Sequence, residues 1–323
     1  MSVSGAVFLY LSDETLAGLG ISTAEVVQVI EEAVLAQAQG ALWASPKSAL
    51  LPGDGRYMMT TLSASDDPGL TVVKAVMVSP RNPARGLSGV NGAIMLLDSE
   101  TGELRAVMDA NWVTGVRTAC LSAVIAKRLA DPGAASVAFI GCGVQARSHL
   151  DAFAELFPLA EIRAFGRGQA NIERLCDAAR GKGLAARACA TARDAVDGAD
   201  LVVSSVTLSY GVEPFVDARW LKPGAFAAIT DLAIPWVPEG MGAFGTVIID
   251  DRAQEAASER PMVAGELISG DLTEIVSGRQ SAEFSPEKRS AFVFRGIAVG
   301  DFALAALAYE RAKADGRGQA VSG

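Results

Sequence analysis

The chain has 323 residues, of which 50% are hydrophobic and 20% are charged, and its formal net charge is -9. This composition is globular, and the length suffices for two domains of ordinary size. An acidic chain without a basic stripe gains no affinity from counterion release, so we expect no nucleic acid as a partner. Since no apolar run is long enough to cross a bilayer, we expect no membrane association either.

Histidine and cysteine, the usual residues of neutral-pH proton transfer and of zinc sites, are scarce. The four cysteines form no Cys-x-x-Cys pair, and residues 1–10 lack the basic start of a signal peptide. Both observations favour a reducing compartment, and we expect the cytoplasm. His149 is the only histidine, and its place on a predicted helix favours packing. A Ser-His-Asp hydrolase or a histidine-rich metal site would depend on that one residue, so we predict neither, and no bound metal.

The first third of the chain predicts one helix followed by a mostly antiparallel sheet. Ser22 and Glu25 have the spacing of a capping box, and apolar residues follow at helical intervals as far as Gly40. Residues 98–102, Asp-Ser-Glu-Thr-Gly, are typical of a hairpin loop. Segments rich in β-forming residues predict strands over 57–62, 70–78, 90–97 and 104–108.

A helix is predicted over 112–130, and strands and helices alternate beyond it. Such alternation indicates a parallel sheet with right-handed crossovers. The predicted strands are 136–140, 161–165, 184–189, 201–206, 226–230 and 246–249, and the predicted helices are 144–157, 171–179 and 192–196. We expect a last helix over 301–313 and a loose polar tail after it.

Residues 135–143 read ASVAFIGCG, so a buried strand runs directly into Gly-x-Gly-x-x-Ala and a helix follows. Gly141 permits the tight turn, Gly143 lets the backbone approach a pyrophosphate, and the small Ala146 lets helix and strand pack closely. The order strand, loop, helix, strand favours a dinucleotide site over a glycine-rich turn without a ligand. The loop residues that we expect to contact the cofactor are Gly141, Gly143, Val144, Gln145 and Ala146.

The end of the second strand bears on the choice of nucleotide. An NAD site usually carries an acid there to bind the ribose 2′-hydroxyl group. Residues 163–169 contain no acid, and Arg167 lies where a 2′-phosphate would bind. We therefore predict NADP(H) in preference to NAD(H); the alternative is that Arg167 is a solvated loop charge.

Three charged residues stand in apolar surroundings. Lys74 interrupts a strand that is apolar on both faces; it is either a buried ammonium group that needs a partner or an edge-strand lysine that discourages aggregation. Arg117, near the start of an apolar helix, can hold a substrate carboxylate or pair with a structural acid. Asp231 follows the strand 226–230, where doubly wound folds bind ligands, unless it merely caps a turn.

Residues 96–129, LLDSETGELRAVMDANWVTGVRTACLSAVIAKRL, resemble the core signature of the ornithine cyclodeaminase/mu-crystallin family. Further segments fall in the family's order, so the resemblance covers nearly the whole chain. These segments are Lys74 with SPRN at 79–82, the loop GCGVQA, VIIDD at 247–251, GEL at 265–267, LTEI at 272–275 and the stretch 301–312.

The resemblance implies an α/β chain of two domains that forms a homodimer. Residues 126–299 would be a doubly wound Rossmann domain that binds the dinucleotide. Residues 1–125, completed by the C-terminal helix within 300–323, would be an α/β domain for substrate binding and dimerisation. Family members bind NAD(H) or NADP(H), and their substrates are amino or imino acids.

The family's functional residues can be carried over to individual positions. Its substrate-carboxylate residues match Lys74 and Arg117, and a first-domain arginine of the cyclodeaminases falls near Lys47. The catalytic aspartate of the cyclodeaminases matches Asp231. We also expect Thr118, beside Arg117, to contact the cofactor. The cyclodeaminases have a lysine four residues after that aspartate, and the chain has Pro235 there, which argues against ornithine cyclisation.

Three hypotheses follow. The first is an NAD(P)H-dependent reductase of an α-imino acid, cyclic or acyclic, in which either Lys74 or Asp231 assists the transfer of a proton. The second is a cyclodeaminase that uses bound NAD+ and releases ammonia. The third is a non-catalytic protein that keeps the cofactor and has lost the chemistry.

Overall fold

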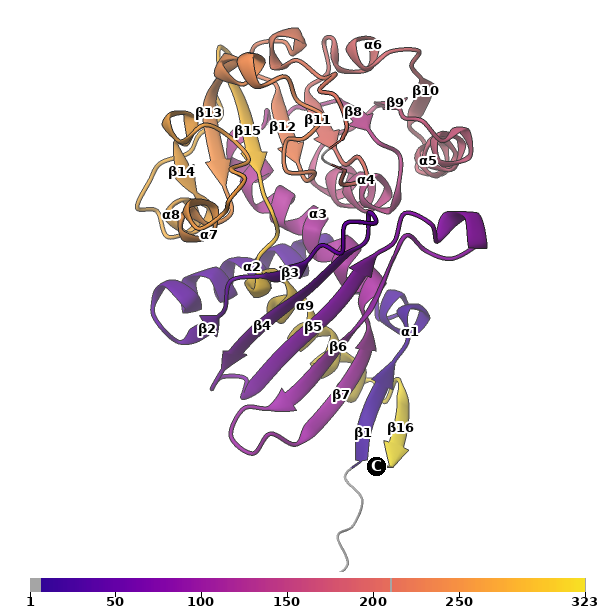
Figure 1. Cartoon of the computed structure of the whole chain (residues 1–323), viewed down its shortest axis with the longest axis vertical. Helices are drawn as coiled ribbons and strands as arrows, with labels where there is room; N and C mark the ends of the chain where they lie inside the picture. Colours follow the sequence, from indigo (N-terminus) through magenta and orange to yellow (C-terminus); the bar gives the residue numbers. More distant parts are fainter. Residues whose placement is uncertain (1–6, 210, 323) are drawn as a thin grey trace, which may run out of the picture. The chain divides into compact units, whose positions relative to one another are not determined.

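The structure is a computed structural model that describes residues 7–209 and 211–322. The chain divides into two compact units (Figure 1), unit 1 with Met1–Arg117 and Ile297–Gly323, and unit 2 with Thr118–Gly296. The family resemblance implies a boundary after residue 125, whereas the units change after Arg117. Both positions lie inside one long helix, α3 (Ala110–Leu129). The first six of the residues considered as a signal peptide lie outside the described part. Each unit is built on its own sheet, which confirms the α/β fold class.

Unit 1 contains a mixed sheet whose strand order, over the described residues, is β16-β1-β7-β6-β5-β4-β2, with β3 pairing with β4. The strands from β4 to β7 pair antiparallel, as predicted. The expected loose tail is wrong, because β16 at the C-terminus pairs with β1, and β1 in turn lies parallel to β7. The bounds are β1 Val7–Leu11, β2 Leu42–Ala44, β3 Ser48–Leu50, β4 Tyr57–Ser65, β5 Leu70–Val78, β6 Val90–Asp98, β7 Leu104–Asp109 and β16 Gln319–Ser322.

Helices cover one face of this sheet. Helix α9 (Ala298–Ala314) packs on β4 and β5, and α2 (Thr23–Ala38) packs on α9 (Figure 1). The predicted capping box at the start of α2 is confirmed, because the side chains of Ser22 and Glu25 each accept a hydrogen bond from the backbone N–H of the other residue. The two short helices of unit 1 are α1 (Asp13–Ala17) and η1 (Pro83–Arg85).

The opposite face of the same sheet carries a row of apolar side chains. Leu62 pairs with Val73, Val73 with Met95, and Met95 with Val107. Leu62 is 45% exposed and Met95 is 42% exposed. Since side chains alternate along a strand, this outer row lies on the side away from α9.

Unit 2 is built on a sheet in which every strand pairing is parallel, over the order β10-β9-β8-β11-β12-β15-β13-β14. This confirms the doubly wound arrangement, although β14 and β15 were not predicted. The strands are β8 Ser136–Ile140, β9 Glu161–Phe165, β10 Ala185–Ala188, β11 Leu201–Ser204, β12 Phe226–Ile229, β13 Phe244–Ile249, β14 Gly270–Asp271 and β15 Arg289–Val293. The helices beside α3 are α4 Val144–Leu156, α5 Gln169–Gly181, α6 Ala192–Val196, α7 Arg252–Ala256, α8 Leu272–Val276, η2 Ala218–Trp220, η3 Pro238–Ala243 and η4 Gly265–Leu267.

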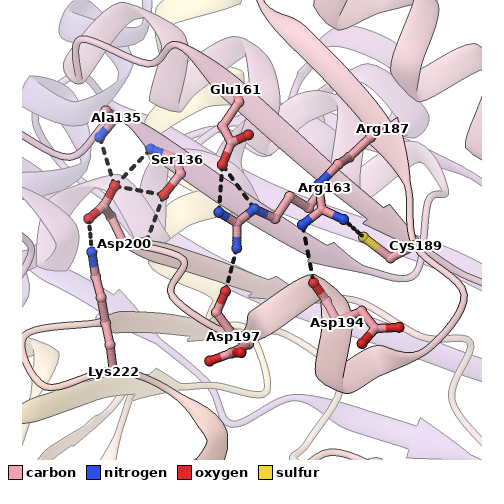
Figure 2. A network of polar contacts seen from close by, with 10 residues as sticks. All are labelled: Ala135, Ser136, Glu161, Arg163, Arg187, Cys189, Asp194, Asp197, Asp200 and Lys222. Carbon is pink, nitrogen blue, oxygen red and sulfur yellow. Dashed lines mark hydrogen bonds and ion pairs between the residues drawn. The ribbon is translucent and has the colours of Figure 1, made fainter.

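Figure 2 shows a polar network at the edge of this sheet where its strands begin. The Oδ2 atom of Asp200 accepts hydrogen bonds from the backbone N–H groups of Ala135 (3.0 Å) and Ser136 (2.9 Å) and from the Ser136 hydroxyl group (2.7 Å). Lys222 forms an ion pair with the other oxygen of Asp200. These bonds join the starts of β8 and β11. Because the two strands are parallel, both end at the opposite edge of the sheet, where folds of this kind bind ligands. None of the described helices is both long and apolar enough to span a membrane.

Candidate functional site

The loop after β8 lies between the ends of three strands of unit 2. Gly141 has φ +91°, and a Cβ atom there would stand 2.6 Å from the carbonyl oxygen of Ser205, which follows β11. The N–H group of Gly141 donates to Phe165 at the end of β9 (2.8 Å). Only glycine tolerates both the positive φ and this close approach. The strand order reverses between β8 and β11, so the loop stands at the switch point of the sheet.

Helix α4 begins at this loop with an end suited to an anion. Gly143 is its N-cap, with no side-chain cap, and a Cβ atom there would meet no atom within 4 Å. The first N–H groups of a helix have no acceptor within the helix and carry the positive end of its dipole. Ala146, one turn in, is fully buried. Both the open space and the donors therefore fit the pyrophosphate of a dinucleotide.

The residue predicted to determine the preference between NADP(H) and NAD(H) follows the end of β9. Arg167 is exposed and lies between β9 and α5. No acid occurs between Arg163 and Gln169. Thr118, the other residue predicted to contact the cofactor, is 6% exposed on α3.

In unit 1, the two predicted carboxylate-binding cations meet at a single acid. The Nζ atom of Lys74 lies 2.5 Å from Oδ1 of Asp301, and the Nε atom of Arg117 lies 2.9 Å from the same oxygen. The Thr61 hydroxyl group donates to Oδ2 of Asp301 (2.9 Å). Lys74 and Asp301 are each 1% exposed. We call these four residues, Thr61, Lys74, Arg117 and Asp301, the cation cluster.

The strand register explains how the cluster forms. Lys74 lies on β5, between β4 and β6, so it is a buried residue of a central strand and not an edge-strand lysine. Thr61 is its direct neighbour on β4. Asp301 comes from the first turn of α9, the helix that packs on these two strands. Asp301 was not predicted as a site residue, although an acid near the start of an Ala/Leu-rich helix is a signal of one.

The cluster contains more positive than negative charge. The pKa of Lys74 is lowered to about 7, mainly by burial and then by the charge of Arg117, against the opposing effect of Asp301. Burial acts to raise the pKa of Asp301, but Arg117 and Lys74 outweigh it and hold that pKa below its usual value. The Nη1 atom of Arg117 is buried and has no hydrogen-bond partner among the described residues. A cluster with surplus charge and an unused donor suits a further carboxylate.

Lys47 lies near this cluster on the segment between β2 and β3. Its Nζ atom is 5.8 Å from the centre of the Tyr57 ring. Its charge contributes to the lowered pKa of Lys74. Lys47 is half-buried, so the structure does not place it as a fully solvated surface lysine.

Asp231 follows β12 in unit 2 and is completely buried. Its Oδ2 atom accepts hydrogen bonds from the Ser204 hydroxyl group (2.5 Å) and from the backbone N–H of Val206 (3.0 Å). These donors belong to the end of β11, not to the turn that follows Asp231. Its Oδ1 atom has no partner among the described residues, and burial raises the pKa of this carboxyl group to about 6. An acid with one satisfied and one unused oxygen is suited to a cationic or proton-donating ligand.

The backbone after Asp231 is strained. Leu232 and Ala233 have φ +58° and +56°, in the left-handed region that residues other than glycine rarely adopt. Such strain often occurs at functional sites, because a precise geometry is being enforced there. Pro235 follows, and its carbonyl oxygen accepts hydrogen bonds from the N–H groups of Phe215 and Val216 (both 2.8 Å).

A doubly wound parallel sheet with a Gly-x-Gly-x-x-Ala loop at its switch point defines a class, the oxidoreductases that depend on a nicotinamide nucleotide. The model of the ornithine cyclodeaminase/mu-crystallin family matches residues 13–316. The chain belongs to this family, which confirms the resemblance in its sequence.

The chain is similar to named proteins along most of its length. It is 31% identical to ketimine reductase mu-crystallin of Mus musculus over 259 residues, which are 78% of this chain and 79% of the relative. Its fold matches that of Thermococcus litoralis Delta(1)-pyrroline-2-carboxylate reductase, solved with NADH and L-proline (TM-score 0.88, 24% identity, 97% of this chain and 100% of the other). It also matches an archaeal alanine dehydrogenase dimer with bound NAD (TM-score 0.85, 25% identity, 98% and 99%).

Proposed function

We propose that the protein is an NAD(P)H-dependent reductase that converts an α-imino acid into the L-amino acid. The observation that carries this proposal is the cation cluster, where Lys74 and Arg117 share the single carboxylate of Asp301. A substrate carboxylate would supply the missing negative charge and use the free Nη1 donor of Arg117. The names of the relatives, a ketimine reductase and an alanine dehydrogenase, agree with such a substrate.

Each residue of the proposed site then has a role in the reaction. Arg117 and Lys74, with Lys47 beside them, hold the substrate carboxylate. The free oxygen of Asp231 stabilises the protonated iminium group, which is the better hydride acceptor. In the product, the imine carbon has gained a hydride and the nitrogen carries a proton. Lys74 is the other candidate for the proton donor, because burial brings its pKa to about 7.

The nucleotide fits the loop after β8. When bound, its nicotinamide ring supplies the hydride for the imine carbon. We propose that Gly141, Gly143 and the first turn of α4 hold its pyrophosphate, with Val144, Gln145 and Ala146 in that turn and Thr118 contributing from α3. Arg167, which is exposed before α5 in a segment without an acid, supports a preference for NADP(H). The two structural neighbours described above contain NADH or NAD. The preference for NADP(H) therefore rests on Arg167 and not on these neighbours.

We further propose that unit 1 binds the substrate carboxylate and forms a homodimer, and that unit 2 is the dinucleotide-binding domain. The outer row of Leu62, Val73, Met95 and Val107 supports dimerisation, because an apolar row across four strands is a typical interface. All four cysteines are free, which supports the cytoplasm as the compartment.

The test is oxidation of NADPH, and separately of NADH, by the purified protein. The panel contains pyrroline-2-carboxylate, piperideine-2-carboxylate, and pyruvate, glyoxylate and oxaloacetate, each with ammonia or methylamine. Oxidation with one imine would support the reductase and identify its substrate class, and a lower KM for NADPH would support the role of Arg167. Binding of the cofactor without oxidation in any mixture would overturn the proposal. Ornithine with NAD+ would then separate an ammonia-releasing cyclodeaminase from a non-catalytic binding protein.

A further inference from the structure

The proposed reaction does not use the buried pair formed by Ser122 of α3 and His149 of α4. Both residues are 0% exposed. The Nε2 atom of His149 lies 2.8 Å from the Ser122 hydroxyl oxygen, and its Nδ1 atom lies 2.8 Å from the carbonyl oxygen of Gln145. Gln145 belongs to the Gly-x-Gly-x-x-Ala loop. A packed histidine is what the sequence predicts here, but one of its two bonds ends at the proposed cofactor loop.

The two hydrogen bonds determine the state of the ring. A carbonyl oxygen only accepts, so Nδ1 carries the proton and donates to Gln145. The Nε2 atom of the neutral ring is then an acceptor, and the hydroxyl group of Ser122 donates to it. Burial keeps the ring neutral by lowering the pKa of His149 to about 4. An edge-to-face contact with Phe153, with centroids 5.7 Å apart, fixes the ring plane.

The bond to Gln145 acts on the group that would face the pyrophosphate. The carbonyl group of Gln145 and the N–H group of Ala146 belong to one planar peptide unit. The histidine ring adds a hydrogen bond to a carbonyl that already belongs to helix α4, so the direction of that N–H group is held more firmly. The N–H of Ala146 lies in the first turn of α4, whose donors have no partner within the helix.

The other end of the pair leads to the second segment expected to contact the cofactor. The Ser122 hydroxyl oxygen lies 3.4 Å from the carbonyl oxygen of Thr118, one turn earlier on α3. Since the Ser122 hydroxyl group donates its one proton to His149, the hydrogen bonds that join α3 to the first turn of α4, within unit 2, run from Ser122 through His149 to Gln145.

We propose that Ser122 and His149 are positioning residues for the dinucleotide, which hold the first turn of α4 against α3 so that its N–H groups point at the pyrophosphate. This inference rests on the proposed cofactor site. It predicts that loss of the pair weakens binding of the nucleotide and leaves turnover at saturating nucleotide unchanged, because neither residue touches the reacting atoms.

The experiment is a fluorescence titration of NADPH and of NADH, without substrate, against the full chain. The variants are Ser122→Ala, His149→Leu and His149→Gln. Ser290→Ala is the matched control, because Ser290 is also a buried serine of unit 2 (4% exposed), and its hydroxyl group donates to the backbone carbonyl of Leu129 (3.2 Å). Thermal unfolding of each variant shows whether the losses of stability are comparable.

We expect Ser122→Ala and His149→Leu to raise the Kd of the nucleotide about tenfold relative to Ser290→Ala. His149→Gln should recover most of the affinity, because its amide group can both accept from Ser122 and donate to Gln145. Equal Kd values for Ser122→Ala, Ser290→Ala and the wild type would overturn the positioning role, as would equal losses for the leucine and glutamine variants. A wild-type protein that binds neither nucleotide would instead overturn the proposed function on which the inference rests.

Discussion

Lys74 and Asp301 form a buried ion pair although 227 positions separate them in the chain, with the Nζ atom 2.5 Å from the Oδ1 atom. The acid comes from the last helix of the chain, and the lysine comes from a central strand of the first sheet. Asp301 serves Arg117 as well, so its carboxylate compensates two buried cations at once.

Replacing Asp301 by Asn should therefore destabilise the protein strongly. Removal of one partner of a buried ion pair typically costs about 3–5 kcal/mol, because the remaining charge is left uncompensated. The control is Thr61→Val, which removes one hydrogen bond to the same carboxylate and should cost about 1 kcal/mol. Urea unfolding of both variants provides the comparison. A loss for Asp301→Asn no larger than for Thr61→Val would show that the cluster does not need this charge.

Replacing Arg117 by Ala should lower kcat/KM for the imino acid by about a hundredfold, the effect of losing one buried charge-assisted contact. Arg180→Ala provides the control, because Arg180 is an exposed arginine that pairs with the exposed Asp177. Steady-state kinetics with the best substrate of the panel measures both. An active Arg117→Ala enzyme with an unchanged KM would remove Arg117 from the substrate site.

The rate should depend on pH in a bell-shaped manner. Burial raises the pKa of Asp231 to about 6, and activity should rise with pH as this acid becomes the carboxylate that stabilises an iminium ion. The pKa of Lys74 is lowered to about 7, and activity should fall above it as the lysine loses its charge. Profiles of kcat/KM for the wild type and for Asp231→Asn test this assignment. If the acidic limb persists in Asp231→Asn, another group is responsible for it.

The free energy of unfolding should depend on pH through His149, the single histidine of the chain. The pKa of His149 is about 4 in the folded protein, against an ordinary value of 6.5. Between these values the unfolded chain binds a proton that the folded chain does not, so stability falls as the pH is lowered through this window. From pH 7 to pH 5 the wild type should lose about 2 kcal/mol more than His149→Gln. Urea unfolding at the two pH values measures the difference, and equal losses would contradict the buried neutral ring.

The outer row of unit 1 should determine the oligomeric state. We expect light scattering to give a mass near twice the 33.4 kDa of one chain. Met95→Lys places a charge in the middle of the row and should yield monomers, because an unpaired charge in an apolar interface is costly. Glu100→Gln, in the exposed β6–β7 loop, changes the net charge by the same amount and should remain a dimer. A monomeric wild-type protein would refute dimerisation through this face.

Local patterns were sufficient for much of unit 2. The strands at 136–140 and 161–165 and the glycine loop between them have the predicted bounds, because each is specified by a short apolar run and its neighbours. The missed strands have other causes. The strand β1 is short, and β16 is polar and exposed, so neither carries a clear period. The strand β16 exists because β1, near the other end of the chain, supplies its partner, and β1 itself pairs with both β16 and β7.

In the candidate site, too, some residues can be recognised from local patterns and others only from the tertiary structure. Gly141 and Gly143 can be recognised from their spacing, because the turn and the phosphate approach impose it. The state of Lys74 cannot, since a strand pattern does not reveal whether the strand is central or at an edge. The pairing of Asp231 with Ser204 likewise depends on which strand lies next to β12.

The discontinuity of unit 1 has a consequence for the order in which the protein is made. During synthesis from the N-terminus, residues 118–296 are all available before α9 and β16 emerge from the ribosome. Unit 2 can therefore fold while Lys74 and Arg117 still lack their common acid. Domains fold as units during synthesis, so the sheet of unit 1 stays open beside β1 until β16 is available. The cation cluster can form only after α9, which carries Asp301, has been synthesised.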